Sequence, residues 1–392
     1  MTDKYDVVII GGGIIGSCIG AHLANENLNV AIVNSLNLGR PASLAAAGLL
    51  TPYQHDEIEN VKLKDFCLNS LDYFKTFYEQ IKQNSKVELG FKQDGSLYLI
   101  FSNSEIGKKE AEVRQNKNHA NITFLNKNEV LKQEPLISSD IVGAYSYPSE
   151  GLINNIKFLK AIFEFNIGRK INIIPDKVVD LNILNNQIES ILLSNNEKLY
   201  AKIYVLCNGV WANNFLKKIL GVQKDIITSI KGEIIEIKEE NNKTINKILF
   251  CEEGYILPRK ATNSFEKSSI LIGSTSEEIN LESHENIFNN TSNGIQKLCN
   301  LLSKVLPSYK KSLILNMCSG LRPKTIDSMP ILGFSQEIDN LLFAVGHYRN
   351  GILMGPLTGK AIKELIVSKN TEIDISTFEI SRFSKNHLIY TN

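Results

Sequence analysis

Apolar residues follow different rhythms along this chain, and each rhythm predicts a different kind of element. Continuous apolar runs predict fully buried parallel strands at 5–10, 28–34, 201–208 and 341–346. Alternating apolar and polar residues predict strands of an antiparallel sheet with one buried face at 226–238 and 246–258. Further extended segments are expected at 95–101 and 170–184. Helices are predicted at 17–27, 65–83, 128–134, 156–168, 288–306 and 357–368, with one more after 209–211.

The order of these elements predicts an α/β fold of two domains. The first strand, the first helix and the second strand form a βαβ unit of about 30 residues, which is the size of a dinucleotide-binding motif. We expect a Rossmann-type dinucleotide-binding domain to be built from residues 1–85, 150–222 and 295–392. An inserted α+β substrate-binding domain, built on an antiparallel sheet, would comprise residues 86–149 and 223–294. A length of 392 residues suits such a division.

The composition is that of a soluble globular protein with balanced charge. Hydrophobic residues make up 43% of the chain, and the formal net charge is +1, so there is no electrostatic case for binding nucleic acid or a membrane surface. No apolar run reaches the roughly 18 residues of a membrane span. No signal peptide is recognised, and we expect a cytoplasmic protein. The six cysteines lack CxxC pairs and metal-like spacing, which predicts reduced thiols and no metal ion.

A glycine-rich turn links the first predicted strand to the first helix. Gly11, Gly13 and Gly16 occupy the three glycine positions of GxGxxG. The first two permit a tight turn and the close approach of a pyrophosphate, and the third permits close packing of the helix on the strand. The helix N-terminus favours the phosphate charge. This context predicts a dinucleotide site rather than an ordinary glycine-rich turn.

The residue expected to hold the ribose departs from the usual motif. Asp or Glu commonly ends the second strand, but Asn34 stands there in this chain. An amide can hydrogen-bond a ribose hydroxyl without charge assistance, at a loss of roughly tenfold in affinity. Because the acid is absent and Arg40 is nearby, these residues alone leave NADP open.

Two arginines near the C-terminus are candidates for binding a small acid. Arg322 lies in SGLRPKTIDSMPILG and Arg349 in GHYRNGILMGP, where glycine and proline predict loops. A guanidinium matches a carboxylate with two parallel hydrogen bonds. Together with the dinucleotide site, they predict a redox enzyme that acts on a small carboxylate. The alternative for Arg322 is an ion pair with Asp327 in the same loop.

The segment after the second strand, GRPASLAAAGLLTP at 39–52, has small side chains in a row that let the backbone approach a flat ring system. It resembles the flavin-contacting loop of the D-amino-acid-oxidase superfamily of FAD-dependent oxidoreductases. Within that superfamily, the chain is most similar to the glycine oxidases of thiamine biosynthesis over essentially its whole length. The motifs that carry the resemblance are GGGIIGS, AAAG, CNGVWAN, GYILPRK, SGLRPKTIDSMPILG and GHYRNGILMGP.

The resemblance implies an activity. A bound FAD would take a hydride from the α-carbon of glycine, sarcosine or a small D-amino acid, which becomes the imino acid. Oxygen would then accept the electrons and give hydrogen peroxide, and the reaction would supply formation of the thiamine thiazole. Selectivity for glycine would come from a pocket too tight for a side chain. The resemblance also implies a homo-oligomer such as a tetramer.

The resemblance also assigns roles to single residues. Tyr255 and Arg322 would bind the substrate carboxylate, with Arg349 close to substrate and flavin, although Tyr255 could instead be a core aromatic residue. Arg259 is left open between a second anchor and a surface residue, and His347 is expected to belong to the flavin-side structure. FAD contacts would come from Gly11, Gly13, Ile14, Ile15, Gly16, Asn34, Ser35, Ala42, Ser43, Ala47, Gly48, Leu49, Lys177, His347, Tyr348, Arg349, Asn350, Gly351, Ile352 and Leu353.

Relatives within the superfamily supply the competing interpretations. Sarcosine oxidases attach their flavin through a cysteine whose place is taken here by Gly320, two residues from Cys318, so noncovalent FAD is expected. D-amino-acid dehydrogenases, which pass electrons to a quinone or another acceptor, share the RPxTxDxxPxxG loop but lack HYRNGIL, and they are the alternative function. A non-catalytic or tRNA-modifying flavoprotein is a third interpretation, and the balanced charge argues against an RNA-binding surface.

Overall fold

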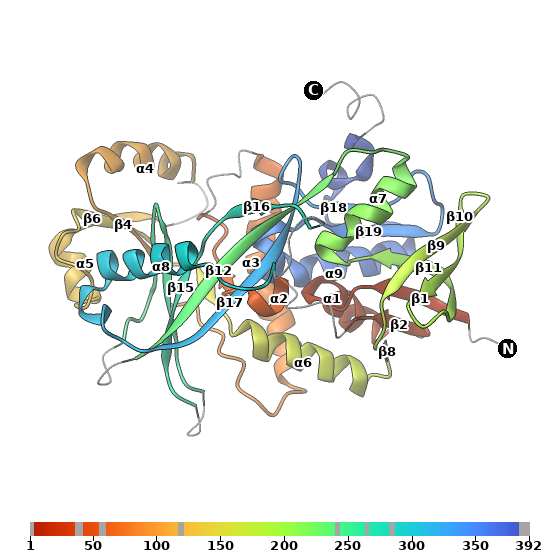
Figure 1. The fold of residues 1–392 in the computed structure, drawn as a ribbon, viewed down its shortest axis with the longest axis horizontal. Helices are drawn as coiled ribbons and strands as arrows, with labels where there is room; N and C mark the ends of the chain where they lie inside the picture. Colours follow the sequence, from red (N-terminus) through yellow and green to blue (C-terminus); the bar gives the residue numbers. More distant parts are fainter. Residues whose placement is uncertain are drawn as a thin grey trace.

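Two large sheets organise the molecule, the first toward the right and the second toward the left in Figure 1. The structure is a computed structural model. It describes residues 4–35, 42–54, 60–116, 121–239, 244–262, 266–281 and 287–383. Arg40, which bore on the choice between FAD and NADP, lies outside these residues.

The first sheet has the strand order β18-β19-β11-β1-β2-β8, with β10 beside β11 and β9 beside β10. Strands β8, β2, β1, β11 and β19 run parallel, which confirms the parallel sheet predicted from the continuous apolar runs. The strands of this sheet are β1 (Lys4–Ile10), β2 (Val30–Val33), β8 (Asn172–Ile174), β9 (Val178–Leu184), β10 (Gln187–Leu193), β11 (Lys198–Leu206), β18 (Ile331–Phe334) and β19 (Leu341–Val345).

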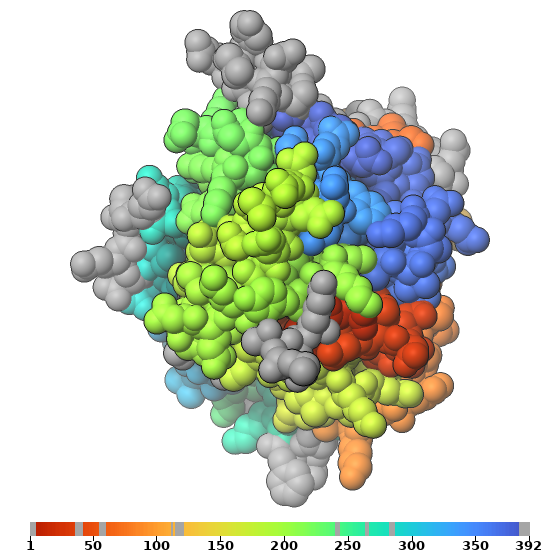
Figure 2. Space-filling view, turned by 90° about the vertical axis from the view of Figure 1, so that its right-hand side faces the viewer, coloured from red at the N-terminus to blue at the C-terminus, as the bar shows by residue number. Residues whose placement is uncertain are grey.

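Helices cover both faces of the first sheet. On one face, a single apolar core joins the sheet to α1 (Ile14–Leu23), α3 (Val61–Lys82), α6 (Asn155–Gly168) and α9 (Gly351–Ser368). On the other face, a second core joins it to α7 (Ala212–Leu220), which follows η1 (Gly209–Trp211), and to η5 (Ile380–Phe383). Figure 2 shows one end of the molecule, where N-terminal (red), central (yellow-green) and C-terminal (blue) segments share one surface. The first sheet and its helices are therefore built from segments that lie far apart in the sequence.

The second sheet has the order β16-β12-β15-β14-β13-β4-β6-β5, with β17 on the other side of β12. Its pairs are antiparallel except for β13 with β4. The strands are β4 (Ser96–Ile100), β5 (Thr123–Asn126), β6 (Gly143–Tyr147), β12 (Ile227–Lys238), β13 (Ile248–Cys251), β14 (Gly254–Arg259), β15 (Ser269–Gly273), β16 (Glu277–Ile279) and β17 (Ile314–Thr325). The associated helical segments are α4 (Asn103–Asn116), α5 (Lys127–Gln133), α8 (Ser292–Val305) and η2 (Pro307–Tyr309).

The remaining elements are short. Strands β3 (Leu49–Leu50) and β7 (Gly151–Leu152) pair with each other near the junction of the two sheets. Helix α2 (Ala42–Ala45) precedes β3, and η3 (Tyr348–Asn350) precedes α9. The last described turn before η5 is η4 (Ser376–Phe378).

Two expectations about the second sheet are wrong. Residues 246–258 do not form one strand: the chain reverses at Glu252 and Glu253, and β13 and β14 pair as a hairpin. Strand β12 is also buried on both faces rather than one. Ile235 and Ile237 share a core with α8, whereas Ile234 packs toward Ala47 at the junction with the first sheet.

The sheets also bear on the proposed domain boundary at residue 294. Strand β17 pairs with β12 along eleven residue pairs, and α8 packs on the back of the second sheet. Helix α8 and strand β17 therefore lie with the second sheet, whereas the sequence predicts residues 295–392 in the dinucleotide-binding domain. The helix expected at 357–368 begins earlier, at Gly351, so that Pro356 lies inside it. Burial of every residue from 352 to 359 stabilises this helix despite the missing proline N–H.

Candidate functional site

The glycine turn after β1 is shaped by two glycines that allow no side chain. Gly11 has φ +112°, and a Cβ there would lie 2.7 Å from the carbonyl oxygen of Cys207, just after the neighbouring strand β11. A Cβ on Gly16 would lie 1.9 Å from the carbonyl oxygen of Gly11, so α1 packs directly on the turn. These contacts match the predicted need for a tight turn and close helix packing. The turn opens at the N-terminus of α1, which begins at Ile14.

Two polar side chains hold this turn in place. Oδ1 of Asn34 accepts a hydrogen bond from the Gly12 N–H at 3.2 Å. Oγ of Ser43 accepts from the Ile14 N–H at 2.9 Å, at the first residue of α1. Both side chains were expected near the cofactor, and the structure places both against the glycine turn. Asn34, which directly follows β2, therefore helps to shape the glycine turn.

The small-residue segment that follows is tied to the second sheet. Nδ2 of Asn155 donates to the carbonyl oxygens of Ser43 at 2.8 Å and Leu44 at 3.2 Å. Nη2 of Arg259 donates to Oδ1 of Asn155 at 3.0 Å. Burial lowers the pKa of Arg259, opposed by the carboxylate of Glu236. Arg259 is half-buried, and its bond to Asn155 supports the loop.

Three segments form walls around one cavity: the glycine turn, the small-residue segment and the C-terminal motif. After β19, the chain turns through Gly346, at φ +79°, and Tyr348, at φ +49°, before α9 begins. Nε2 of His347 lies 3.1 Å from Oγ1 of Thr358, about two turns into α9. Burial lowers the pKa of His347 to about 3, so its ring is neutral at ordinary pH. His347 is therefore a buried part of this wall, and its place beside the flavin stays a prediction.

Arg322 faces these walls from the second sheet. It lies on strand β17 and not in a loop, because the segment from 314 to 325 pairs along its whole length with β12. Its Nη2 donates to Oγ of Ser274 at 2.8 Å, and its Nη1 donates to the carbonyl oxygen of Thr275 at 3.3 Å. The guanidinium lies over Gly232, where a Cβ would be 2.1 Å from Nη2. The glycine on β12 makes room for the arginine on β17.

The alternative ion pair of Arg322 with Asp327 is wrong. Asp327 pairs instead with Arg382, whose Nε lies 2.7 Å from its Oδ2. Tyr255 lies on β14 beside Phe250, with ring centroids 6.1 Å apart. Burial raises the pKa of Tyr255, and the positive charges of Arg322 and Arg349 oppose that rise. Arg349 is exposed in η3, with its guanidinium 5.1 Å from the centroid of the Tyr348 ring.

One cavity of about 680 Å³ joins the three walls. Of the residues proposed from the sequence, Gly16, Asn350 and Leu353 lie behind its surface, and the others line it. Those that line it are Gly11, Gly13, Ile14, Ile15, Asn34, Ser35, Ala42, Ser43, Ala47, Gly48, Leu49, Lys177, Tyr255, Arg322, His347, Tyr348, Arg349, Gly351 and Ile352. The cavity thus runs from the carboxyl ends of the parallel strands, where such folds bind dinucleotides, to the arginine-bearing sheet.

Sequence reasoning missed several residues of this cavity. Gln54, Asn208 and Gly232 line it, and so do Ser274 and Thr275. Oε1 of Gln54 and Oδ1 of Asn208 are buried and find no hydrogen-bond partner among the described residues. Asn208 lies in the motif CNGVWAN, which could have marked it, whereas nothing in the sequence marks Gln54.

The residues present fit a dinucleotide. The glycine turn leaves a cradle that any Cβ would fill, and Oδ1 of Asn208 offers a buried acceptor beside it. Within the described part of the chain, no cluster of three or more His, Cys, Asp or Glu residues could hold a metal ion. None of the described helices has both the length and the apolar content needed to cross a bilayer.

A dinucleotide cradle on a parallel sheet, facing an arginine on an antiparallel sheet, defines a dinucleotide-dependent oxidoreductase with a separate substrate layer. The chain belongs to the family of FAD dependent oxidoreductases known as DAO, whose family model matches residues 6–365. FAD is accordingly its cofactor, and the resemblance drawn from the sequence motifs is confirmed.

Several known proteins are similar over the whole chain. The bifunctional protein ThiO/ThiG of Trichormus variabilis is 30% identical over 97% of this chain, which covers 55% of that protein. The glycine oxidase of Bacillus subtilis is 29% identical, with 97% of this chain and 98% of that protein covered. The structure of glycine oxidase from Geobacillus kaustophilus has a TM-score of 0.86 at 26% identity, over 97% of this chain and 99% of that one. The chain thus spans about half the length of its bifunctional relatives and nearly all of the glycine oxidases.

Proposed function

We propose that this protein oxidises glycine, with sarcosine and small D-amino acids as further substrates, to the imino acid with formation of hydrogen peroxide. One observation carries the proposal: Arg322 and Tyr255 line the same cavity as the glycine turn and the segment that follows β19. A planar guanidinium binds a carboxylate bidentately, so it would fix the orientation of a small amino acid in the cavity. The similarity to glycine oxidases over nearly their whole length supports the same substrate class.

The side chains have distinct roles in this proposal. Arg322 would bind the carboxylate, and Tyr255, whose raised pKa keeps its hydroxyl protonated, would donate a hydrogen bond to the same group. Arg349, exposed in η3, adds positive charge to the cavity. FAD, when bound, supplies the acceptor for the hydride, so the protein needs no strong side-chain base. His347 is poorly suited to act as a base because its pKa is lowered to about 3 by burial.

Two groups of residues would hold the cofactor. The glycine turn and the N-terminus of α1 would receive the pyrophosphate, with Asn34 and Ser35 beside the ribose and Lys177 near the adenine. The segments 42–49 and 347–353 would flank the flavin. We propose that the flavin is bound noncovalently, because a Cβ on Gly320 would lie 2.5 Å from Cβ of Ala45. That position therefore has no room for a linking side chain.

The cellular setting is proposed from the relatives. The name of the bifunctional relatives joins ThiO and ThiG in one protein, which supports a role in forming the thiamine thiazole. We further propose a cytoplasmic homo-oligomer, such as a tetramer. Light scattering coupled to size-exclusion chromatography would test the oligomer, and a mass of one 43.9 kDa chain would refute it.

The decisive experiment is the visible spectrum of the purified protein during anaerobic addition of glycine. Bleaching of the flavin bands, followed by peroxide when air is readmitted, would support the proposal. Bleaching by D-alanine but not by glycine, with slow reaction with oxygen and rapid reaction with a quinone, would support a D-amino-acid dehydrogenase instead. In the Arg322→Ala variant, KM for glycine should rise steeply while FAD stays bound. An unchanged KM would remove Arg322 from the carboxylate role.

A further inference from the structure

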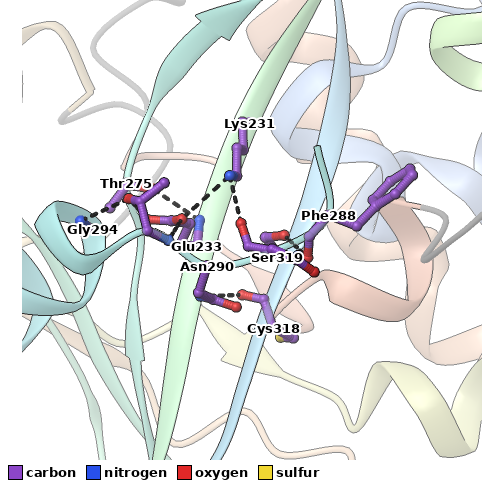
Figure 3. Close-up of polar contacts among 10 residues, drawn as sticks. Lys231, Glu233, Thr275, Phe288, Asn290, Gly294, Cys318 and Ser319 are labelled. Carbon is purple, nitrogen blue, oxygen red and sulfur yellow. Dashed lines mark hydrogen bonds and ion pairs between the residues drawn. The ribbon is translucent and has the colours of Figure 1, made fainter. Parts of the chain in front are cut away.

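Strand β12 carries two charged residues that are buried away from the cavity. Lys231 is 6% exposed and Glu233 is 2% exposed, on the face of β12 that packs toward α8. Gly232, between them in sequence, points to the opposite face and lies under the Arg322 guanidinium. Lys231 and Glu233 therefore lie on one face of β12, and Gly232 lies on the other. Figure 3 shows the charged pair between β12, β17 and the start of α8.

Glu233 holds the first turn of α8. Its Oε1 accepts from the Thr291 N–H at 2.6 Å, and its Oε2 lies 3.3 Å from Oγ1 of Thr291. That hydroxyl accepts in turn from the Gly294 N–H at 3.0 Å and caps the helix. The fit is tight, because a Cβ on Gly294 would lie 1.4 Å from Oε2 of Glu233. The backbone at residue 233 is thereby fixed against α8 (Figure 3).

Lys231 fixes the segment just before that helix. Its Nζ donates to the carbonyl oxygen of Asn289 at 2.6 Å and lies 3.5 Å from Oε1 of Glu233. Neighbouring bonds hold the same segment to β17: Nδ2 of Asn290 donates to the carbonyl oxygen of Cys318 at 3.2 Å, and Oγ of Ser319 donates to that of Phe288 at 2.6 Å. A buried ion pair contributes little net stability, so these contacts are better explained by a need for fixed geometry.

The backbone of Glu233 leads from this cluster to the substrate anchor. Its N–H donates to Oγ1 of Thr275 at 2.9 Å, and its carbonyl oxygen accepts from the Thr275 N–H at 3.3 Å. The carbonyl oxygen of Thr275 then accepts from Nη1 of Arg322. Thr275 is thus bonded on one side to Glu233 and on the other to the guanidinium. A shift of residue 233 would move the acceptor that orients Arg322.

We propose that Glu233, held by Lys231, is a positioning residue that sets Arg322 for the substrate carboxylate by fixing Thr275. This inference rests on the proposed role of Arg322. It differs from a purely structural role in its consequence: loss of Glu233 would weaken carboxylate binding specifically, and would do so through Thr275.

The test uses the FAD-loaded protein and acetate, a small carboxylate whose binding is read from the change in the flavin spectrum and needs no turnover. Glu233→Gln removes the negative charge, and Thr275→Val removes the hydroxyl that accepts from the Glu233 N–H. Each should raise the Kd for acetate about tenfold, raise KM for glycine by a similar factor, and change kcat by less than twofold. The double variant should be no worse than either single one, because both act on the same path.

Glu134→Gln is the matched control. Glu134 directly follows α5, is 1% exposed, and accepts backbone N–H bonds from Asn246 and Lys247, just before β13, at 2.9 Å each. It does not line the cavity. This variant should lower Tm and leave the Kd for acetate unchanged. Unchanged acetate binding by Glu233→Gln and Thr275→Val would overturn the proposal. So would an equal loss in Glu134→Gln, which would indicate general loosening of the sheet. Failure of the unmodified protein to bind acetate would instead refute the role of Arg322 itself, and the inference with it.

Discussion

Replacing Gly232 by alanine should damage substrate binding while sparing the fold. A Cβ at this position would lie 2.1 Å from Nη2 of Arg322 and 2.3 Å from its Cζ, whereas ordinary contact begins near 3.4 Å. The guanidinium must therefore move by more than about 1 Å, and it can do so because it ends a flexible side chain. A misplacement of about 1 Å can reduce rates by about 100-fold. We expect that loss in kcat/KM for glycine, equivalent to about 2.7 kcal/mol of transition-state stabilisation.

The assay is anaerobic stopped-flow reduction of the bound FAD over a range of glycine concentrations. The FAD content and Tm of the variant should stay close to those of the unmodified protein, because the clash falls on Arg322 and not on the backbone. Gly107→Ala on α4 is the control, since no atom lies within 4 Å of a Cβ placed there. A Gly232→Ala variant that holds FAD and reacts within twofold of the unmodified protein would refute the reasoning.

Three further predictions follow from polar groups around the cavity. Burial raises the pKa of Glu150 to about 7 in the folded protein, whereas the pKa in the unfolded chain is near 4.5. As pH rises, the unfolded chain therefore loses this proton first. The free energy of unfolding should fall by about 3 kcal/mol between pH 4.5 and 7. In urea titrations, Glu150→Gln should make the free energy of unfolding less dependent on pH between 4.5 and 7. An unchanged pH dependence would contradict the raised pKa of Glu150. Asn34→Asp should tighten FAD binding by up to about tenfold in titrations of the apoprotein, because the ribose bond gains charge assistance; weaker binding would count against a ribose contact. His347, neutral above a pKa of about 3, should contribute no ionisation to the pH profile of kcat/KM between pH 5 and 9, so His347→Gln should leave the shape of that profile unaltered.

Much of the fold was predictable because local pattern and tertiary burial agree there. The parallel strands are buried on both faces, as their continuous apolar sequences predict. The predictions failed where tertiary packing overrides a local signal. Pro356 predicts a helix start, yet α9 begins five residues earlier because its first two turns are buried against the first sheet and α1. The glycine and proline around Arg322 predict a loop, yet pairing with β12 makes the segment a strand.

Residues of the candidate site could be predicted where they belong to a sequence motif. Gly11 and Gly16 are required by contacts that the GxGxxG spacing implies. The bond from Arg259 to Asn155 could not be predicted, because it joins β14 to the start of α6 across 104 residues of sequence. Ser274 and Thr275 likewise reach Arg322 only through the folding of the second sheet. Sequence motifs can name candidate site residues, but the residues that contact and orient their side chains are set by long-range packing.

Strand β12 shows how such orienting residues can nevertheless be recognised. An alternating strand should place apolar residues on its buried face, and β12 is buried on both faces, so the charges of Lys231 and Glu233 break the pattern twice. Glycine between them weakens a strand interior and is expected only where something approaches closely. All three exceptions fall opposite Ser319–Leu321, the residues that precede Arg322 on β17. Because evolution tolerates local inconsistency mainly where function requires it, the charged–glycine–charged triplet inside this buried strand supports the proposal that β12 positions Arg322.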